Sequence, residues 1–377
     1  MKIAYVHDVI YPYVKGGAEK RVWEMARRLA DRGHEVHIFG MKFWDGEDVI
    51  EREGVQLHGI CAPQNLYVGG KRSIKTSVLF SWKLLWSFKG DFDVIDAQEF
   101  PYFPCFSAKF HSHWGNTPLV ITWYEVWDDY WYEYLGRKGP LGKWTERCTT
   151  RLPNKIVPIS ERIRDDLISI GVGEERMEVV PNGVDYSGIQ KIGCERELYD
   201  VLYAGRLSEH KNVDLLLKAV NLVRDDLPSI RCGIVGDGPE RDNLVKMAKD
   251  LSLEDNVEFL GFLDKDEEVM EKMKSSKIFV LPSSREGFPN TILEANACGV
   301  PVIVVDSEKN AGVEAVKDGV NGAICKLSAE SMAISIFRLL EGDLYKKMSD
   351  QSRENARKHD WKIIVNKIEM TYDGLDG

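Results

Sequence analysis

The chain has 377 residues, a length that suggests two or three domains. Apolar residues make up 44% and charged residues 29%, which is a globular composition without the roughly 18–20 continuous apolar residues that a membrane helix needs. The formal net charge of −10 argues against a nucleic-acid partner, because such proteins normally carry a basic excess.

The seven cysteines stand singly, without a Cys-x-x-Cys pair. This pattern predicts neither a zinc site nor a disulfide framework and favours a reducing, cytoplasmic location. The opening residues, MKIAYVHDVI, are typical of a buried strand and lack the cleavage pattern of a signal peptide.

Short β-branched runs alternate with helical patterns in the first half of the chain. Between the first two expected strands, apolar residues recur at helical spacing, and Gly33 ends the expected helix. The expected strands are Lys2–Val9, Glu35–Gly40, Asp93–Ala97, Leu119–Trp123 and Lys155–Ile159.

The second half repeats the scheme, with strands separated by helices such as Val213–Arg224, Glu240–Leu251 and Asp266–Ser275. The expected strands are Val201–Ala204, Ile230–Val235, Val257–Leu260, Ile278–Leu281, Val302–Val305 and Gly322–Cys325.

This alternation predicts an α/β protein with two doubly wound, Rossmann-like domains, whose parallel sheets are covered by helices on both faces. We expect one domain over residues 1–184, a second over 185–357 and a helical segment over 358–377. The boundary follows Pro181-Asn182-Gly183, where periodicity is weak. Because ligands bind at the carboxyl ends of parallel strands, we expect functional loops there, facing a central cleft.

Two cations follow the strand Val201–Ala204 in the segment GRLSEHKN. A guanidinium from Arg206 and an ammonium from Lys211, placed just before a helix, suit a diphosphate. Two solvated surface charges are the alternative interpretation of this segment by itself.

The segment SSREGFPNTILEANACG carries two acids eight positions apart, Glu286 in a loop and Glu294 inside the following helix. The turn and the helix start offer free amides for a phosphate, and Glu294 can accept hydrogen bonds from ribose hydroxyls. A surface helix charge is the alternative for Glu294. The candidate phosphate-binding positions are Gly287, Phe288, Asn290 and Thr291.

Two glycine turns also follow expected strands. Gly236-Asp237, in GDGPE, does not match the G-x-G-x-x-G fingerprint, because Arg241 stands at the third glycine position, but the turn has room for a flat base. Gly16-Gly17, in VKGGAEK, lets the backbone approach a phosphate or sugar closely. A simple tight turn is the alternative for Gly16-Gly17.

The combination of GGAEK, VPNGVD, GRL-x-x-x-K, GDGPE and EGFPNTILE, in this order, resembles the retaining glycosyltransferases of family 4 type, with the GT-B fold. The resemblance implies that Arg206 and Lys211 bind the donor diphosphate and stabilise it as leaving group. It implies that Glu286 contacts the transferred sugar, while Glu294 holds the ribose. No cofactor or metal is expected, because Arg and Lys supply the needed charge.

The resemblance also implies that Gly17 approaches the phosphate from the other domain, and that the helix around Trp361 returns to the first domain. One position departs from the family pattern. Tyr124, in VITWYEVW, stands where the family has a histidine before the acid Glu125. A phenol is a poor base at neutral pH, so Tyr124 is expected to orient the sugar or to lower activity. The histidines that remain as substitutes are His7, His111 and His113.

Three further segments keep two interpretations each. Asp91-Phe92-Asp93 matches the metal-binding D-x-D pattern, but its second acid opens an apolar strand, which favours a structural role. Trp123–Tyr134 is rich in aromatic and acidic residues and fits an acceptor-binding loop or a packing loop.

The segment Lys71–Lys89 places an apolar stripe beside lysines, which fits either an anionic membrane surface or packing against the sheet. The stripe consists of Ile74, Val78, Trp82, Leu85 and Trp86.

The sequence therefore predicts transfer of a hexose-type unit from a nucleotide diphosphate donor, such as a UDP-sugar or GDP-mannose, to a hydroxyl acceptor with retention of configuration. The acceptor is a glycan, a lipid-linked molecule or a small molecule, and peripheral contact with the inner membrane face remains open. A sugar-nucleotide epimerase of similar fold is one alternative. A catalytically weak, donor-binding partner subunit is another, motivated by Tyr124.

Overall fold

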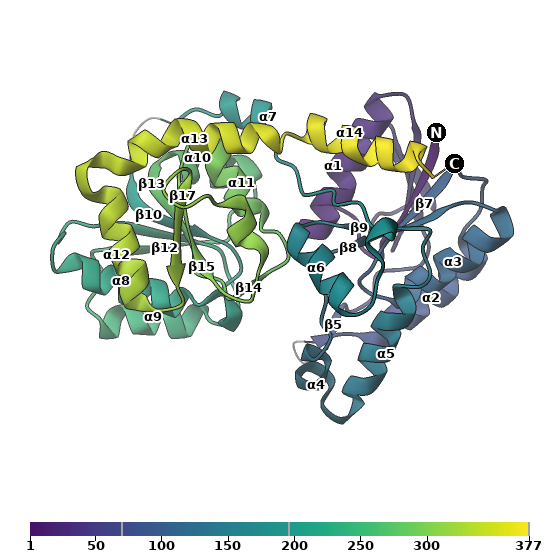
Figure 1. Cartoon of the computed structure of the whole chain (residues 1–377), viewed down its shortest axis with the longest axis horizontal. Helices are drawn as coiled ribbons and strands as arrows, with labels where there is room; N and C mark the ends of the chain where they lie inside the picture. Colours follow the sequence, from purple (N-terminus) through teal and green to yellow (C-terminus); the bar gives the residue numbers. More distant parts are fainter. Residues whose placement is uncertain (69–70, 195–196, 376–377) are drawn as a thin grey trace. The chain divides into compact units, whose positions relative to one another are not determined.

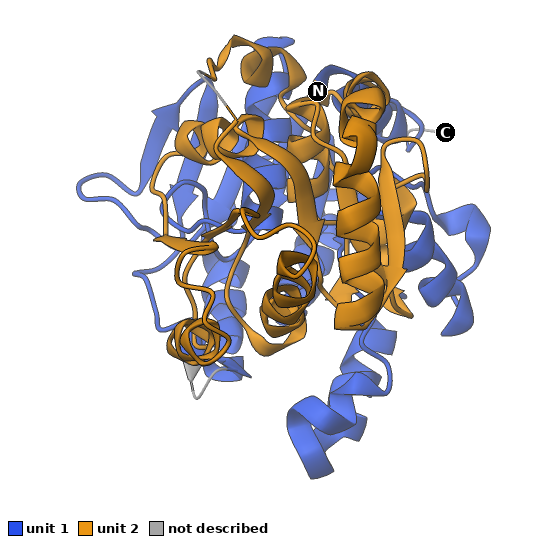
Figure 2. Cartoon of the chain, turned by 90° about the vertical axis from the view of Figure 1, so that its left-hand side faces the viewer, with its two compact units in different colours: residues 1–181, 362–377 blue, residues 182–361 orange. Residues whose placement is uncertain are grey.

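The computed structural model describes residues 1–68, 71–194 and 197–375. The chain divides into two compact units, coloured separately in Figure 2. Unit 1 consists of residues 1–181 and 362–377, and unit 2 of residues 182–361. Two residues of the weakly periodic boundary segment, Glu195 and Arg196, lie outside the described residues.

The sequence placed the limits of the second domain at residues 185 and 357. In the structure, unit 2 begins earlier, at Asn182, and ends later, at Trp361. The reason is a pairing of the segments that enter and leave the unit. The backbone N–H of Val184 donates to His359 O at 2.9 Å, and the N–H of Trp361 donates to Val184 O at 3.2 Å. Gly183 packs under the Trp361 ring, where a Cβ would lie 2.4 Å from a ring carbon. Both segments therefore belong to unit 2.

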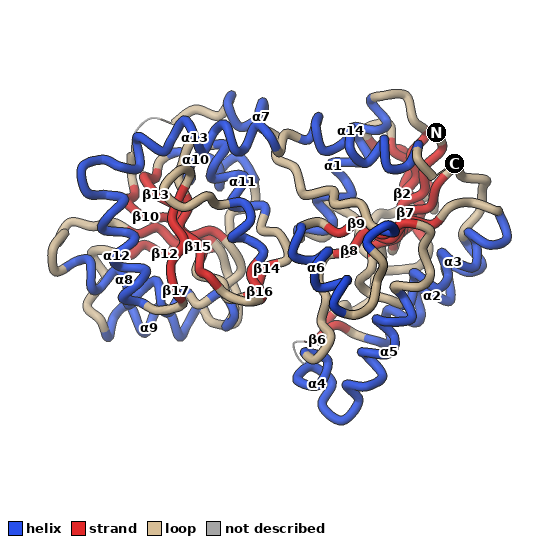
Figure 3. The backbone as a smooth tube through the Cα atoms, viewed as in Figure 1, coloured by secondary structure: helices blue, strands red, loops and turns tan. Residues whose placement is uncertain are grey.

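Unit 1 is built on a seven-stranded sheet in the order β3-β4-β2-β1-β7-β8-β9 (Figure 3). The strands are β1 (Lys2–Val6), β2 (Glu35–Gly40), β3 (Val49–Arg52), β4 (Val55–Gly59), β7 (Val94–Gln98), β8 (Leu119–Trp123) and β9 (Lys155–Pro158). The two-residue strands β5 (Tyr67–Val68) and β6 (Lys71–Arg72) pair antiparallel with each other.

The five strands expected in this half are confirmed, but the expectation of purely parallel pairing is wrong at one edge. There β3 pairs antiparallel with β4 through a turn at Glu53 and Gly54, which both have positive φ. The edge strand β3 alternates between exposed and half-buried residues, so it lacks the apolar run that marks a buried strand.

The helices of unit 1 lie around its sheet, except for α4 and α5, which extend away from it (Figure 1). They are α1 (Gly17–Asp31), α2 (Ile74–Ser87), α3 (Phe103–Gly115), α4 (Tyr130–Leu135), α5 (Gly139–Thr149), α6 (Glu161–Ser169) and α14 (Trp361–Asp373), which belongs to this unit from Lys362 onward. Helix α1 buries the apolar residues that predicted it, Val22, Met25, Ala26 and Leu29, and Gly33 follows its end with φ +89°.

Unit 2 has a six-stranded, all-parallel sheet in the order β12-β11-β10-β13-β15-β17. Its strands are β10 (Tyr199–Ala204), β11 (Cys232–Val235), β12 (Val257–Gly261), β13 (Ser276–Leu281), β15 (Val302–Asp306) and β17 (Gly322–Lys326). The short strands β14 (Arg285–Glu286) and β16 (Lys309–Asn310) form a separate parallel pair.

The helices of unit 2 include the three expected from periodicity and one that was not expected, α7. They are α7 (Tyr186–Lys191), α8 (Val213–Arg224), α9 (Arg241–Asp250), α10 (Asp266–Lys274), α11 (Asn290–Ala297), α12 (Ala329–Leu340) and α13 (Leu344–Lys358). Helix α7 has only six residues, too few for an apolar period to show, and its signal is the cap, where Asp185 Oδ1 accepts from Gly188 N–H at 3.0 Å.

A buried polar cluster ties the last helix to the sheet of unit 1. Asp96, in β7, is 1% exposed and accepts hydrogen bonds at 3.0 Å from Thr122 Oγ1 and from Gln98 Nε2. Tyr372, on α14, donates to Asp96 at 2.6 Å, and its oxygen lies 3.1 Å from that of Tyr5. These contacts explain why the chain's last residues belong to unit 1.

Asp96 makes the stability of unit 1 depend on pH. Burial raises the pKa of its carboxyl from 3.8 to about 6, and the hydrogen bonds from Tyr372 and Thr122 oppose this only in part. The folded carboxyl binds its proton more tightly than the unfolded one. Its contribution to stability is therefore largest below about pH 4 and is lost as the pH rises through about 6.

We expect the unfolding free energy of the wild type minus that of Asp96→Asn to fall by about 2–3 kcal/mol between about pH 4 and about pH 7. Urea denaturation at both pH values measures this difference. Asp91→Asn, at an exposed position of the same unit, is the matched control and should show no such change. A wild-type-minus-Asp96→Asn difference that stays constant with pH would contradict the raised pKa.

Candidate functional site

In each sheet the first strand of the chain lies in the middle. The next strands are added on one side of it, and the later strands on the other side. The topological switch point, where the strand order reverses, lies between β1 and β7 in unit 1 and between β10 and β13 in unit 2. The loops that leave the carboxyl ends of such neighbouring strands diverge, and ligands of parallel α/β sheets bind there. The sequence-predicted residues lie in these loops, in the loops beside them or in the helices that follow. Gly16, Gly17 and Tyr124 belong to unit 1 and the others to unit 2.

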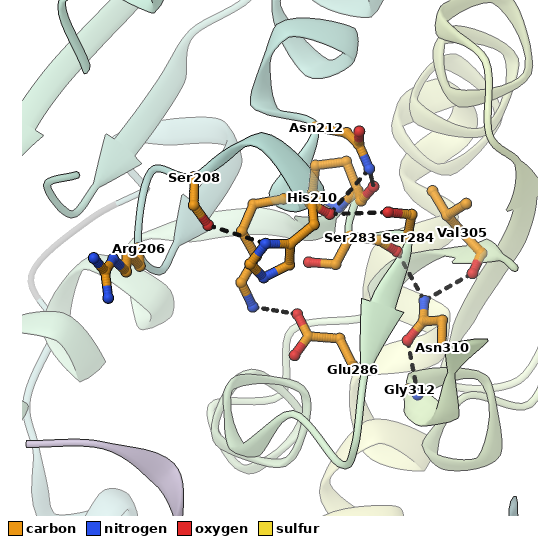
Figure 4. Close-up of polar contacts among 12 residues, drawn as sticks. Arg206, Ser208, His210, Asn212, Ser283, Ser284, Glu286, Val305, Asn310 and Gly312 are labelled. Carbon is orange, nitrogen blue, oxygen red and sulfur yellow. Dashed lines mark hydrogen bonds and ion pairs between the residues drawn. The ribbon is translucent and has the colours of Figure 1, made fainter. Parts of the chain in front are cut away.

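At the topological switch point of the unit 2 sheet, the Lys211 ammonium is paired with Glu286 (Figure 4). Lys211 ends a 3-10 turn after β10, whereas Glu286 follows β13, and their side chains are only 17% and 12% exposed. The backbone joins the same two loops, because Ser284 N–H donates to His210 O at 3.0 Å. The structure thus brings together two residues that the sequence placed in separate motifs.

Arg206 is not part of this pair. Its side chain is exposed and points away from Glu286 in Figure 4. Among the described residues, its guanidinium has no hydrogen-bond or ion-pair partner, while its carbonyl accepts from Tyr203 OH at 3.0 Å. Arg206 is therefore an available cation on the loop that also holds Lys211.

Sequence reasoning missed two residues beside the pair, the half-buried His210 and the buried Ser283. His210 precedes Lys211, and its Nδ1 lies 3.4 Å from Ser208 Oγ. Burial, with the nearby Lys211 charge, lowers the pKa of His210 to about 4, so the ring is neutral at physiological pH. Ser283 is fully buried, and its Oγ finds no hydrogen-bond partner in the described part of the chain.

Two buried asparagines hold the loop that carries Glu286. Asn310 Nδ2 donates to Ser283 O at 3.1 Å and to Val305 O at 2.8 Å. Asn182 Nδ2 donates to Phe288 O at 3.2 Å and to Asn290 Oδ1 at 2.8 Å. Because both sides of the loop are fixed, Glu286 faces Lys211 without support from a ligand. The motif VPNGVD, which contains Asn182, therefore has a structural role within unit 2.

The predicted phosphate positions lie at the start of α11. Phe288 is buried, whereas Gly287, Asn290, Thr291 and Glu294 are half-buried. Pro289 caps the helix without a side-chain hydrogen bond. The first amides of a helix have no intrahelical acceptor, so this turn can bind an anion.

Gly236 is required by backbone packing. It has φ +132°, and a Cβ there would lie 1.9 Å from Gly205 O. The two loops are joined further on, where Leu207 N–H donates to Asp237 O at 2.9 Å. Asp237 is exposed, and its Oδ1 accepts from Gly238 N–H at 2.7 Å. The glycine turn after β11 thus supports the loop that carries Arg206 and Lys211.

In unit 1, Gly16 and Gly17 are exposed at the start of α1. Gly16 has an extended φ of −155°, so its backbone does not require glycine. A Cβ at Gly16 would lie 2.3 Å from Glu19 Oε2, because the Glu19 carboxylate already occupies the helix start. An anionic ligand at this end would have to displace that carboxylate.

Tyr124 follows β8 and is half-buried. Its hydroxyl donates a hydrogen bond to Gln98 Oε1, and its N–H donates to Glu99 Oε2 at 3.2 Å. Burial raises the pKa of the phenol well above its usual value, although the Arg21 guanidinium opposes this. Tyr124 is therefore protonated at neutral pH, and its proton is already engaged with Gln98.

The three histidines named as substitutes lie in different places. His7 follows β1 at the topological switch point of the unit 1 sheet, whereas His111 and His113 lie on α3. Burial, with the nearby Arg72 charge, lowers the pKa of His7 to about 3. His7 is therefore neutral, and its Nδ1 has no hydrogen-bond partner in the described ranges.

Both halves of the chain match known families. The model of Glycosyltransferase Family 4 matches residues 15–187, and that of Glycosyl transferases group 1 matches residues 189–359. The chain belongs to the glycosyltransferases of family 4 and group 1.

Relatives extend over nearly the whole of this glycosyltransferase. The gpi3 subunit of the Schizosaccharomyces pombe phosphatidylinositol N-acetylglucosaminyltransferase is 22% identical, over 98% of this chain and 80% of its own. The phosphatidyl-myo-inositol mannosyltransferase of Mycolicibacterium smegmatis is 25% identical, over 98% of this chain and 94% of its own. The crystal structure of Anabaena HepE in complex with UDP has a TM-score of 0.75 at 21% identity and covers 99% of this chain and 100% of that one. The expected GT-B fold is confirmed.

The aromatic and acidic loop of this glycosyltransferase is organised by one buried carboxylate, which the sequence did not indicate. Glu146, on α5, is fully buried and accepts hydrogen bonds from Trp127 N–H at 2.8 Å, Asp128 N–H at 2.9 Å, Trp131 Nε1 at 3.2 Å and Tyr102 OH at 3.0 Å. Trp127 lies before α4, which begins at Tyr130, so Trp127 and Trp131 do not share a helical face although they are four residues apart.

The described residues contain no group of three His, Cys, Asp or Glu side chains placed to hold a metal ion. Within the same ranges, none of the helices has the length and apolar character needed to span a membrane. Asp93 accepts from Lys2 N–H at 2.6 Å just before β7, which gives this acid of the D-x-D pattern a structural contact.

Gly236→Ala should weaken nucleotide binding as well as stability. The new Cβ meets Gly205 O and moves the loop that carries Arg206 and Lys211. Gly319→Ala is the matched control, because Gly319 also has positive φ, +74°, but nothing lies within 4 Å of its added Cβ. We expect the control to lose about 1 kcal/mol of stability and to keep the nucleoside diphosphate affinity of the wild type, measured by calorimetry with UDP and GDP. Equal nucleoside diphosphate affinity in both variants would contradict this role of Gly236.

Glu146→Gln should loosen the loop around Trp127, because an amide nitrogen replaces one of the acceptor oxygens that these donors share. We expect a loss of about 2 kcal/mol or more in unfolding free energy and a weaker near-ultraviolet circular dichroism signal from the tryptophans. Glu133→Gln, on the exposed side of α4, serves as control. If the two variants melt alike, Glu146 does not organise the loop.

Proposed function

We propose that this glycosyltransferase moves a hexose-type unit from a nucleoside diphosphate sugar to an acceptor hydroxyl, with retention of configuration and without a metal ion. The observation that carries the proposal is the Lys211–Glu286 pair at the topological switch point of the unit 2 sheet. Arg206 lies on the same loop as Lys211. The two cations supply positive charge where a leaving diphosphate develops negative charge.

Glu286 holds the Lys211 ammonium in place before the donor arrives, so little reorganisation is needed during the reaction. Arg206 has a guanidinium free to form two parallel hydrogen bonds with phosphate oxygens. The amides at the start of α11 add donors for the same group, and Glu294, within that helix, is assigned to the ribose hydroxyls. Glu286 is assigned to the hydroxyls of the transferred sugar.

The proton of the acceptor hydroxyl goes, in this proposal, to an oxygen of the departing phosphate. Tyr124 is unsuited to accept it, because its pKa is raised and its own proton is donated to Gln98. Attack on the face from which the diphosphate leaves retains the anomeric configuration without a covalent intermediate. Tyr124 then acts on the sugar only through the lone pairs of its oxygen.

The donor and acceptor classes are inferred from relatives. The UDP complex of Anabaena HepE supports a UDP-sugar, and a mannosyl donor such as GDP-mannose is the alternative. Two relatives are named for phosphatidylinositol acceptors, which favours a lipid-linked acceptor over a free glycan. The free state of all seven cysteines fits the proposed cytoplasmic location.

We expect one sugar nucleotide to raise the melting temperature of the purified protein and to release its nucleoside diphosphate slowly in the presence of EDTA. UDP-, GDP- and ADP-sugars are compared, and the anomer of the product is assigned by NMR. Formation of an epimer would identify an epimerase instead. Binding of the donor without release of nucleotide, unchanged by Tyr124→His, would favour a partner subunit.

Lys211→Met should lower kcat by about 10²–10³-fold, because a donor to the developing charge is lost. Lys218→Met is the matched control, since Lys218 lies on α8 of the same unit and pairs with Asp214 at the surface. Rates of nucleotide release at saturating donor measure the effect. An equal loss in both variants would mean that charge at Lys211 is not used in the reaction.

A further inference from the structure

The apolar stripe of α2 faces outward. The residues that α2 buries are Thr76, Ser77, Phe80 and Leu84. Four of the five stripe residues are exposed and Leu85 is half-buried; the exposed fractions of Ile74, Val78, Trp82 and Trp86 are 53%, 46%, 57% and 69%. The interpretation in which this stripe packs against the sheet is therefore wrong. Two exposed tryptophans four residues apart also contact each other, with ring centroids 5.9 Å apart.

Helix α3 carries a second stripe of the same kind. Its residues recur every three or four positions, which puts them on one side of the helix. They are Phe103, Phe106, Phe110 and Trp114, with exposed fractions from 36% to 75%. The side of α3 that faces the protein holds small residues instead, such as Cys105, Ser107 and Ala108.

The two helices lie side by side in unit 1 (Figure 1). Ser81 Oγ donates to Phe103 O at 2.9 Å, and Ser107 Oγ donates to Ser81 O at 2.8 Å. Small hydroxyl residues thus fill the contact between the helices, and the large aromatic residues are left for the surface. We call the outward side chains of these two stripes, with Leu141 of α5, the aromatic face; Leu141 is 63% exposed and lines a cavity together with Ile74 and Phe103.

The aromatic face continues inward as an apolar cavity of about 210 Å³. Its lining includes Ile74 from α2, Phe103 at the start of α3 and Leu141 from α5. Trp131 and Tyr134 of α4 also line it. A surface that is aromatic outside and hollow beneath suits flexible hydrocarbon chains better than a rigid protein partner.

The three helices that carry the aromatic face have basic residues and no exposed acid, whereas α4, beside the cavity, carries the exposed acid Glu133. Neither α2 nor α3 contains Asp or Glu, and the only acid of α5, Glu146, is fully buried. Lys75 and Lys83, on α2, are exposed. This local basic character contrasts with the net charge of −10 of the whole chain. The acids next in sequence, Asp91 and Asp93, lie beyond the end of α2.

We propose that the aromatic face docks on an anionic lipid bilayer. Tryptophan side chains lie favourably at the boundary between headgroups and acyl chains, and exposed lysines bind anionic headgroups. The cavity then opens toward the bilayer and admits the hydrocarbon chain of a lipid. The docking step does not depend on sugar transfer, whereas the supply of a lipid-linked acceptor from this surface rests on the proposed function.

The test is co-sedimentation of the full chain with vesicles, without donor or acceptor. Vesicles of phosphatidylcholine alone are compared with vesicles of phosphatidylcholine and phosphatidylglycerol in equal parts. We expect binding to the anionic vesicles, weaker binding to the neutral ones and a decline with added salt. The triple variant Trp82→Ser, Trp86→Ser, Trp114→Ser should lower the partition coefficient by about tenfold or more.

Two matched controls separate the face from general effects. Ile334→Ser with Met370→Ser removes apolar side chains that are 69% and 73% exposed elsewhere, and it should bind vesicles like the wild type. Lys75→Glu with Lys83→Glu should weaken binding to anionic vesicles by about tenfold or more. Lys246→Glu with Lys249→Glu, at exposed positions of α9, changes the net charge equally and should not. Melting temperature and UDP binding check that each variant is folded.

Three results would overturn the proposal: no binding to either vesicle, equal loss in the face variants and their controls, or a wild-type dimer in solution that the tryptophan variant converts to a monomer. The last result would make the aromatic face an interface between copies of the chain. Because UDP binding and nucleotide release are measured separately, failure of docking is distinguishable from failure of the proposed transfer reaction.

Discussion

The order of parallel strands is the constraint on which the candidate site depends. Each sheet begins with its central strand and is completed first on one side and then on the other. The loops that follow β10 and β13 consequently start next to each other and then diverge. That arrangement brings Lys211 and Glu286 into contact although they are 75 residues apart in the chain. The carboxyl edge of a parallel sheet is thus both a topological feature and the place where charged side chains meet.

Both units position their loops with buried polar groups. In unit 2, Asn310 and Asn182 hold the loop of Glu286 from two sides. Gly236 lets its own turn pack closely against Gly205, at the start of the loop that carries Arg206 and Lys211. In unit 1, Asp96 and Glu146 each accept several hydrogen bonds in the interior. A buried carboxylate is costly unless its hydrogen bonds are satisfied, so such groups specify one arrangement of the chain around them.

The two units use their surfaces differently. Unit 2 gathers its candidate residues at the sheet edge, where half-buried charges and free amides suit a diphosphate. Unit 1 presents aromatic side chains and lysines on α2 and α3, while its own sheet edge holds Tyr124, His7 and buried carboxylates. The two proposed ligands, a sugar nucleotide and a lipid surface, are chemically opposite, and the proposals assign them to different parts of one chain.

The sequence by itself determined the alternation of strands and helices, the boundaries of α8 and the start of α11, because apolar periodicity and glycine stops are local properties. It also marked Arg206, Lys211 and Glu286 through their motif. Only the tertiary structure decided that Lys211 faces Glu286, that Gly236 is needed for backbone packing and that the stripe of α2 faces solvent. Periodicity shows that a helix has an apolar side but not what covers that side, since contacts between distant segments decide burial. Glu146 gave no local signal for the same reason, because its partners come from other parts of the chain.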